Sequence, residues 1–351
     1  METDLIIDHR RRMPELDSLA PPEKEARFDV VASKALEQYG LSPDTLTCLF
    51  HSDGLTYKVE SQSEIYLLRI HTGVGTAYSA VFCAKLGIQS PMLWQLALSE
   101  QTQLAVQIPR RTTTGELVAE VANDDPRAVP HLCSLVTWTP GHERDIESRE
   151  QAYELGRIAG VLHRHVASWA LPPGFERAEW DAPQTIGYLH ELQPYVEEGG
   201  RVSPTVYSLA ERACVLVEEK MAAIPKTPEN WGLIHGELGW FGNCIYDDGI
   251  GSPIDFNGCA FGHYMHDLAK TLWFVRYEFR QGLIEAYGEE MSLPRDHMEQ
   301  LMVFYMAEMI FRTGTRAQHP LDIIMPDTAE HELSAGLQGE YDVMFEPPDL
   351  P

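Results

Sequence analysis

The sequence is poor in basic residues, and this shortage excludes several classes of partner. Its 351 residues include 27 Lys and Arg against 53 Asp and Glu, a formal net charge of −26. Nucleic acids and anionic membranes are bound through clustered cations, so we expect neither as a partner. The same charge would attract cationic small molecules, although acidity by itself more often serves only solubility.

Paired cysteines and long apolar runs are also missing. The six cysteines are scattered without a C-x-x-C pair, which predicts reduced, mostly buried thiols. No apolar run approaches the ~20 residues that cross a bilayer, and the first residues lack the apolar core of a signal peptide. We therefore expect a cytoplasmic protein. The length and the 44% apolar content predict a globular chain of two domains or one bilobed unit.

The first part of the chain has the sequence pattern of an antiparallel sheet. Residues 1–26 are charged and broken by prolines, which predicts an irregular leader, and residues 27–138 are predicted to form a β-rich lobe. Short β-rich runs predict its five strands at Leu46–His51, Thr56–Glu60, Glu64–Ile70, Glu116–Val121 and His131–Trp138. Two helices are expected in this lobe, near Phe28–Tyr39 and at Pro91–Ser99, the latter capped by Ser90.

Helical periodicity dominates residues 139–316, after a Pro-Gly hinge near residue 140. Helices are predicted at Glu150–Trp169, Val206–Ala223, His266–Tyr287 and Asp296–Arg312. The Pro-, Gly- and Glu-rich region Leu171–Arg201 is predicted to be an insertion or a mobile connection. Residues 317–351 contain eight Asp or Glu and no Lys or Arg, which predicts an acidic tail. Two lobes around a hinge predict a cleft.

The chemistry is expected in two short segments near residue 240. The first, G-L-I-H-G-E-L-G-W-F-G-N, carries Glu237 and ends at Asn243, and the second carries Asp255. If the residues between them form a hairpin around Asp247-Asp248-Gly249, Asn243 and Asp255 lie at the same end of it. Oxygen ligands of this kind suit Mg²⁺, which keeps water and nucleotide phosphates in its other positions. Glu237 could then accept a proton from a hydroxyl that attacks a phosphoryl group.

These segments resemble a known signature. His235-Gly236-Glu237, Asn243 and Ile254-Asp255-Phe256 together look like the motif of the aminoglycoside phosphotransferase and choline kinase group, a branch of the protein-kinase-like fold. Further pieces agree in order, and the resemblance extends from about Thr45 to Arg312: Tyr66–His71 resembles the strand with the nucleotide-binding basic residue, Cys133–Gly141 the hinge, and Leu155–His163 the helix that ends in L-H.

The resemblance implies an α+β, protein-kinase-like bilobal fold, with a five-stranded antiparallel N-lobe and a larger, mainly helical C-lobe. It also implies a kinase that uses ATP and Mg²⁺ to phosphorylate a hydroxyl of a small molecule. In the C-lobe, Asn243 and Asp255 match the Mg²⁺ ligands, and Glu237 takes the place of the catalytic base. His235 matches the residue that orients the catalytic loop, and Asp267 the residue that braces this loop.

In the N-lobe, the resemblance implies five residues that contribute to nucleotide binding. Arg69 would bind the phosphates, and Asp53 and Gly54 would lie in the loop that covers them. With a single glycine this loop signal is weak, and a plain hairpin turn would have the same sequence. Leu135 and Val136 belong to the segment that would lie against the adenine, with backbone groups reading its edge.

The sequence departs from the family pattern at several of these positions. Glu237 replaces an aspartate, in a loop one residue longer than usual, and Arg69 replaces a lysine. Pro91 stands where a helix normally supplies a glutamate to that basic residue, and Glu100 lies two turns further on. Geometry errors of about 1 Å can cost on the order of 10²-fold in rate. The longer side chain of Glu237 and the longer loop could instead compensate for each other.

These departures leave a second hypothesis open, a pseudokinase that binds a nucleotide or a partner protein and transfers nothing. A third, a His-Asp metal site of a phosphohydrolase built from His163, His165, His263, His266 and Asp267, is disfavoured by the predicted strands. The acceptor is also open: acid-rich segments favour an aminoglycoside or another cationic alcohol, while amino alcohols such as homoserine, sugars and protein Ser/Thr side chains remain alternatives. Trp240, between two glycines of the catalytic loop, could line the acceptor pocket or fill the space left by the extra residue.

Overall fold

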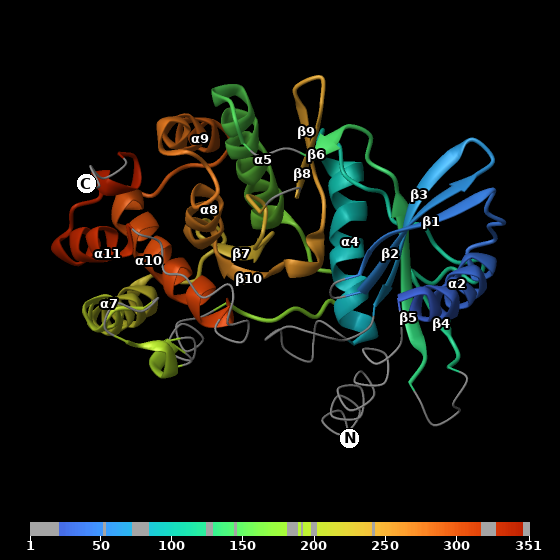
Figure 1. Cartoon of the computed structure of the whole chain (residues 1–351). Coiled ribbons are helices and arrows are strands. Elements are labelled where there is room, and N and C mark those ends of the chain that lie inside the picture. The colour runs from blue at the N-terminus through green and yellow to red at the C-terminus, as the bar shows by residue number, and fades with distance from the viewer. Residues whose placement is uncertain are drawn as a thin grey trace. The chain divides into compact units, whose positions relative to one another are not determined.

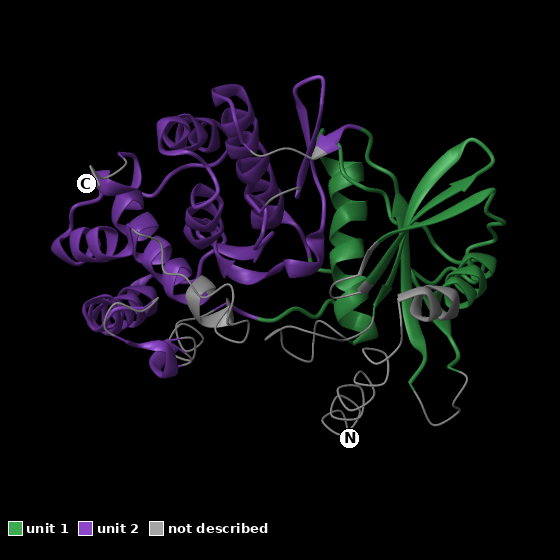
Figure 2. Cartoon of the chain, in the orientation of Figure 1, with its two compact units in different colours: residues 1–140, 171–178 green, residues 141–170, 179–351 purple. Residues whose placement is uncertain are grey.

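The computed structural model divides the chain into two compact units (Figures 1 and 2). It describes residues 21–51, 54–71, 84–123, 129–143, 146–180, 189–190, 192–197, 202–240, 243–316 and 328–346. Unit 1 comprises residues 1–140 and 171–178, and unit 2 comprises residues 141–170 and 179–351. The chain therefore returns to unit 1 for eight residues after its first passage into unit 2.

Unit 1 is built on a five-stranded antiparallel sheet with the strand order β1-β2-β3-β5-β4. Its strands are β1 (Thr45–His51), β2 (Gly54–Ser61), β3 (Glu64–His71), β4 (Val118–Val121) and β5 (His131–Thr137). Each expected strand is present, and the fold-class prediction is confirmed. Alternation explains this success, because Tyr66, Leu68 and Ile70 of β3 are buried while the residues between them are partly exposed.

Two helices pack on opposite faces of this sheet. Helix α2 (Pro21–Gln38) buries Phe28, Ala32 and Leu36 against one face, and helix α4 (Lys85–Gln101) packs Ile88 and Met92 against Leu117 and Val118. Helix α2 begins earlier than predicted, so residues 21–26 of the expected irregular leader are helical. Prolines 21 and 22 are compatible with this start, because the first turn of a helix needs no amide hydrogens from them.

Helix α4 differs from its prediction in a way that involves Pro91. The helix begins at Lys85, so Pro91 lies in its interior and Ser90 is not its N-cap. Proline has no N–H to donate to the carbonyl four residues earlier, at Gly87. Arg177, from the segment that returns to unit 1, donates its Nη1 to that Gly87 oxygen at 2.9 Å. In addition, Glu176 N donates to Ser90 Oγ at 2.9 Å. The returning segment therefore supplies the hydrogen bond that Pro91 cannot make.

Unit 2 is mainly helical. Its described helices are α5 (Arg149–Ser168), α7 (Pro204–Ala223), α8 (Tyr264–Leu272), α9 (Tyr277–Glu290), α10 (His297–Arg316) and α11 (Ala329–Gln338), with short 3₁₀ turns η1 (Gln193–Tyr195), η2 (Phe256–Gly258) and η3 (Asp342–Met344). A capping box between Ser148 and Gln151 begins α5. No helix in the described ranges has the length and apolar character required to traverse a lipid bilayer.

Two predictions about unit 2 need correction. The single helix expected at His266–Tyr287 is two helices, α8 and α9, with a break at 273–276. The break contains no proline or glycine, and Arg280 stabilises it by donating Nε to the Val275 oxygen at 2.8 Å and Nη1 to the Met344 oxygen at 2.6 Å. Residues 329–346 of the expected acidic tail also belong to the helical core, because Leu333 and Met344 are fully buried.

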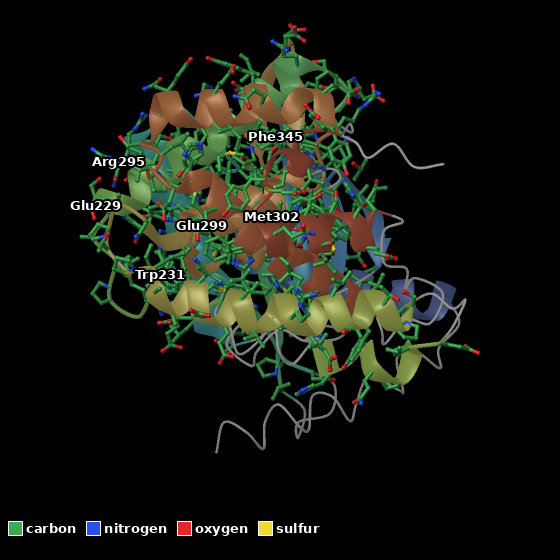
Figure 3. All side chains as sticks on the ribbon, turned by 90° about the vertical axis from the view of Figure 1, so that its left-hand side faces the viewer. Glu229, Trp231, Arg295, Glu299, Met302 and Phe345 are labelled. Carbon is green, nitrogen blue, oxygen red and sulfur yellow. The ribbon has the colours of Figure 1, made fainter. Side chains whose placement is uncertain are left out.

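The helices at the C-terminal end of unit 2 are tied to one another by side chains. Glu299 of α10 accepts a hydrogen bond from Lys220 of α7, and Met302 of α10 is 1% exposed (Figure 3). A β-carbon on Gly336 of α11 would lie 2.8 Å from the sulfur atoms of Met302 and Met306, so the small residue permits close helix packing. The short strands that carry the site contact other helices of the unit, α5 and α8.

Those strands form two small sheets. β7 (Trp231–Ile234) pairs antiparallel with β10 (Ala260–His263), and β8 (Cys244–Asp247) pairs with β9 (Ile250–Pro253) and with the two-residue strand β6 (His142–Glu143). The predicted hairpin is confirmed, with Cys244 opposite Pro253. Its two-residue connection has positive φ angles at Asp248 (46°) and Gly249 (84°), the geometry that twists two strands into a tight hairpin.

Candidate functional site

The loop that follows β7 is fixed in place by a buried carboxylate. Asp267, near the start of α8, accepts a hydrogen bond from His235 N at 2.9 Å and another from Gly236 N at 2.8 Å. Gly236 has a φ of +81°, which favours glycine, and a β-carbon there would lie 2.8 Å from the Gly258 oxygen. The bracing role expected of Asp267 is thus present as hydrogen bonds to the loop backbone.

Asp267 is held in turn by a chain of buried side chains. His163 of α5 lies 3.1 Å from Asp267 through Nε2 and 3.0 Å from the Tyr287 hydroxyl through Nδ1. An ionised carboxylate only accepts, so Nε2 donates to Asp267, and the Tyr287 hydroxyl is the partner of Nδ1. Burial alone would raise the pKa of Asp267, but the hydrogen bonds from His163 and Gly236 and the nearby histidines lower it to about 2.

His235 links this loop to the segment that carries Asp255. Its ring lies 3.0 Å from the Ile254 oxygen through Nε2 and 3.3 Å from the Glu237 amide through Nδ1. The first atom must donate and the second must accept, which is the pattern of a neutral imidazole. Burial lowers the pKa of His235, in agreement with that state. With both nitrogens used by the backbone, His235 positions the two segments and is not free to transfer a proton.

Asn243 and Asp255 lie at the same end of the β8–β9 hairpin, as predicted. Ile254 N donates to the Asn243 backbone oxygen at 2.9 Å, and Asn243 Nδ2 donates to the Glu237 backbone oxygen at 3.0 Å. The second bond engages the amide nitrogen of Asn243. The bond to Glu237 therefore does not use Oδ1, which is the atom that a hard cation would coordinate. Asp255 has left-handed backbone angles, φ 55° and ψ 56°, and its Oδ1 accepts from Asn257 at 2.9 Å.

This donor set fits a magnesium ion that is shared with phosphates. One amide oxygen and one carboxylate leave most positions of an octahedral ion to water and phosphate oxygens. Within the described ranges, no three His, Cys, Asp or Glu side chains are grouped so that they could hold a metal ion without such help. His163 and Asp267 do meet, but as part of the brace behind the loop. They do not form part of a histidine metal cluster.

Among the loop residues that the structure describes, Glu237 and Trp240 have side chains that water can reach. Glu237 is partly exposed, whereas Trp240 is 40% exposed and packs edge-on against Phe274, with ring centroids 5.2 Å apart. Trp240 N donates to the Glu237 oxygen at 3.0 Å, and Asn243 N donates to the Trp240 oxygen at 2.9 Å. These two bonds link the backbone of Trp240 to that of Glu237 and to that of Asn243.

Unit 1 contains the residues expected to bind the nucleotide. Arg69 is opposite Thr56 of β2 and Ser134 of β5, on the partly exposed face of β3. Gly54 pairs with His71 at the start of β2, whereas Asp53 lies outside the described residues. The loop prediction therefore has only one described member.

The two hinge residues differ in orientation. Val136 is opposite Leu67 and so shares the face of Arg69, while Leu135 is opposite Leu68 and is fully buried in the core on the other face. The Leu135 oxygen accepts from Arg110 N at 2.8 Å, and Trp138 N donates to the Ile65 oxygen at 3.0 Å. These backbone groups are thus bonded within unit 1. From the register of the strands, Val136 is the one of the two hinge residues whose side chain lies on the face of Arg69.

Several supporting residues were missed by sequence reasoning. His163 was noted as the end of the helix that ends in L-H and as a possible metal ligand, but nothing in the sequence connects it with Tyr287 or Asp267, 124 and 104 positions away. Arg177 gave no signal either, although the interior Pro91 requires some donor for Gly87. None of the five described cysteines forms a disulfide bond, and four of them are buried, as expected.

The comparisons with known proteins agree with this geometry. Residues 90–302, more than half of the chain, match the family model APH, the phosphotransferase enzyme family. The chain is 24% identical over 283 residues to an amicoumacin kinase of Bacillus subtilis (strain 168), a match that covers 79% of this chain and 76% of that protein.

Solved structures show the same fold. A microcompartment-associated aminopropanol kinase superposes with a TM-score of 0.69 at 23% identity, covering 90% of this chain and 96% of the other. An amicoumacin kinase in complex with AMP-PNP, Ca²⁺ and Ami superposes with a TM-score of 0.68 at 19% identity, covering 95% and 98%.

Proposed function

Since the chain belongs to the APH phosphotransferase enzyme family, we propose that it uses ATP and Mg²⁺ to phosphorylate a hydroxyl of a small, amine-bearing molecule. The observation that carries this proposal is the hydrogen-bonded link between the two loops of unit 2. Asn243 Nδ2 is bonded to the Glu237 oxygen, and Ile254 N is bonded to the Asn243 oxygen. A candidate base and two candidate Mg²⁺ ligands thereby occupy one rigid frame.

Each residue has a separate task in this mechanism. Asn243 and Asp255 would hold Mg²⁺, which neutralises charge on the nucleotide phosphates. Glu237 orients the acceptor hydroxyl and takes its proton, while His235 and Asp267 position the loop. In unit 1, Arg69 would bind phosphate through its guanidinium, Gly54 and Asp53 would belong to the covering loop, and Val136 would contact the adenine. Most of the acceleration comes from positioning and charge neutralisation, so a glutamate base is compatible with turnover.

An amine-bearing acceptor is supported by charge and by the relatives. The chain carries a net charge of −26, and a structurally similar protein is a kinase of aminopropanol, itself an amino alcohol. The exposed Trp240 would offer an aromatic face to such a cation. If exposed charges attract the acceptor, its KM rises with ionic strength, because salt screens them. A KM that does not change with salt would contradict the amine preference and leave the phosphotransferase proposal intact.

Thermal unfolding with ATP, GTP and ADP, each with and without Mg²⁺, tests the nucleotide site. At 100 times its Kd a ligand adds about 2.7 kcal/mol to the free energy of unfolding, which raises the midpoint by a few degrees. We expect a Mg²⁺-dependent shift with ATP that is lost in Asp255→Ala and kept in Glu237→Ala. ADP release with aminopropanol should fall by about 10²- to 10⁴-fold in Glu237→Ala. A nucleotide shift without release of ADP for any amino alcohol would favour the pseudokinase.

A further inference from the structure

We propose that Gly258 is the positioning residue that allows a glutamate to serve where the family has an aspartate. The side chain of Glu237 occupies the space that a side chain at position 258 would fill. This inference rests on the proposed role of Glu237 as the group that meets the acceptor hydroxyl. It adds a second residue, in a different loop, that decides where the carboxylate lies.

The contact between the two residues is close. A β-carbon placed on Gly258 would lie 2.7 Å from Glu237 Oε2, 2.9 Å from its Cδ and 3.1 Å from its Cγ. Separations of this size are shorter than the usual non-bonded contacts of a carbon atom, which are about 3.5–4.0 Å, so the carboxylate lies directly against the Gly258 backbone. Gly258 is buried and has no positive φ. Its backbone would therefore accept alanine, and the contact with Glu237 is what requires the missing side chain.

The backbones on both sides of this contact are held. Gly236, next to Glu237, approaches the Gly258 oxygen so closely that its own β-carbon would lie 2.8 Å from it. The loop is bonded to Asp267 through His235 N and Gly236 N, and the His235 ring is bonded to the Ile254 oxygen. A side chain at 258 therefore cannot be accommodated by separating the two loops. It would be accommodated by rotating Glu237, whose carboxylate is the flexible end of the contact.

In this arrangement, a side chain at position 258 would change the position of the Glu237 carboxylate and would leave the fold unchanged. An aspartate is shorter by one methylene group, so its carboxylate would not reach the backbone of Gly258 in the same way. A glutamate needs the extra room. Displacement of a catalytic group by about 1 Å costs on the order of 10²-fold in rate, so the loss should appear in kcat while the KM for ATP stays near its original value.

Four variants test the pair: Gly258→Ala, Glu237→Asp, the double variant, and Gly282→Ala as a matched control. Gly282 lies in α9, where a β-carbon would meet only Arg149 Cγ at 3.8 Å. The readouts are crystal structures of the variants and ADP release with aminopropanol and with water as acceptors. We expect Gly258→Ala to turn the Glu237 carboxylate away and to lower kcat by about 10- to 100-fold. The double variant should be more active than Gly258→Ala alone, and Gly282→Ala should resemble the parent.

The outcomes separate this inference from the proposed function. An unmoved Glu237 carboxylate in Gly258→Ala would overturn the inference, whatever the activity. A moved carboxylate with unchanged kcat in all variants would show that the contact exists but that Glu237 is not the base, which contradicts the proposed function. A third outcome is that the carboxylate moves and kcat falls, but the double variant is no more active than Gly258→Ala. This would overturn the positioning role, because an aspartate at 237 does not reach position 258 and should recover activity lost through crowding there.

Discussion

The two units hold their candidate residues by different means. In unit 1, Arg69 lies on a central strand whose neighbours pair with it through the backbone ladders of β2 and β5. In unit 2, Glu237, Asn243 and Asp255 lie on loops, and the first of these loops is fixed by side chains from distant helices. The hydrogen bonds between paired strands are shared among many backbone groups, so one side chain contributes little to them. A loop that is held by one carboxylate depends on that single side chain. The helical unit should therefore be the more sensitive of the two to single buried substitutions.

The largest expected effect breaks the brace of unit 2 through Asp267→Asn. An asparagine has the same shape but presents one amide group to donors that need an acceptor, so a buried hydrogen bond is lost. We expect a loss of about 3 kcal/mol in the free energy of unfolding and at least about a tenfold loss of kcat. Asp247→Asn, at the exposed end of β8, is the matched control. Equal stability of the two variants would mean that the loop is held by its own turns.

Acid should weaken unit 2 through its buried histidines. Burial, with nearby lysines, lowers the pKa of His263 from 6.5 to about 4 and that of His266 to about 3. Between those values and 6.5 the unfolded chain binds protons that the folded chain does not, so stability is full above pH 6.5 and falls as the pH is lowered. The slope is about 1.4 kcal/mol per pH unit for each histidine.

Denaturant unfolding at pH 7.5, 6.5 and 5.5 checks this slope. His266→Phe, which keeps a ring against Phe304 but cannot titrate, should reduce the slope, and the exposed His331→Phe should leave it unchanged. The buried histidines of the described ranges all belong to unit 2. A slope that is unaffected by His266→Phe would therefore place the acid sensitivity in other groups and remove this part of the contrast between the units.

The smallest effect concerns a place in unit 1 that resembles the brace of unit 2. Arg177 is buried and donates to the Gly87 oxygen that Pro91 leaves without a helical partner. Arg177→Ala should cost about 1–3 kcal/mol in the free energy of unfolding. In a Pro91→Ala background the helix supplies its own donor, so the same change should cost less. Arg111→Ala, which removes an exposed bond to the Gly115 oxygen, is the control. Equal costs in both backgrounds would contradict the link to Pro91.

Local patterns were sufficient where local geometry decides the structure. Alternation predicted β3, the Asp-Asp-Gly turn predicted the hairpin, and the hairpin brought Asn243 and Asp255 to one end. Prediction failed where a distant residue decides. Pro91 suggested a helix start because no local signal reveals Arg177, and the break between α8 and α9 depends on Arg280 and the Met344 oxygen. The buried part of the C-terminal segment was missed because its acidic composition hides Leu333 and Met344.

By itself, the sequence determined the five strands and the hairpin, because strand alternation and turn chemistry are local properties, and it supplied the candidate residues that we propose for phosphoryl transfer. Only the tertiary structure decided how these residues are held: Asp267 and His163 behind the loop, and Gly258 beside the Glu237 carboxylate. The physical reason is distance along the chain. Hydrogen bonds and steric contacts between residues tens of positions apart form only after folding, and no local pattern records them.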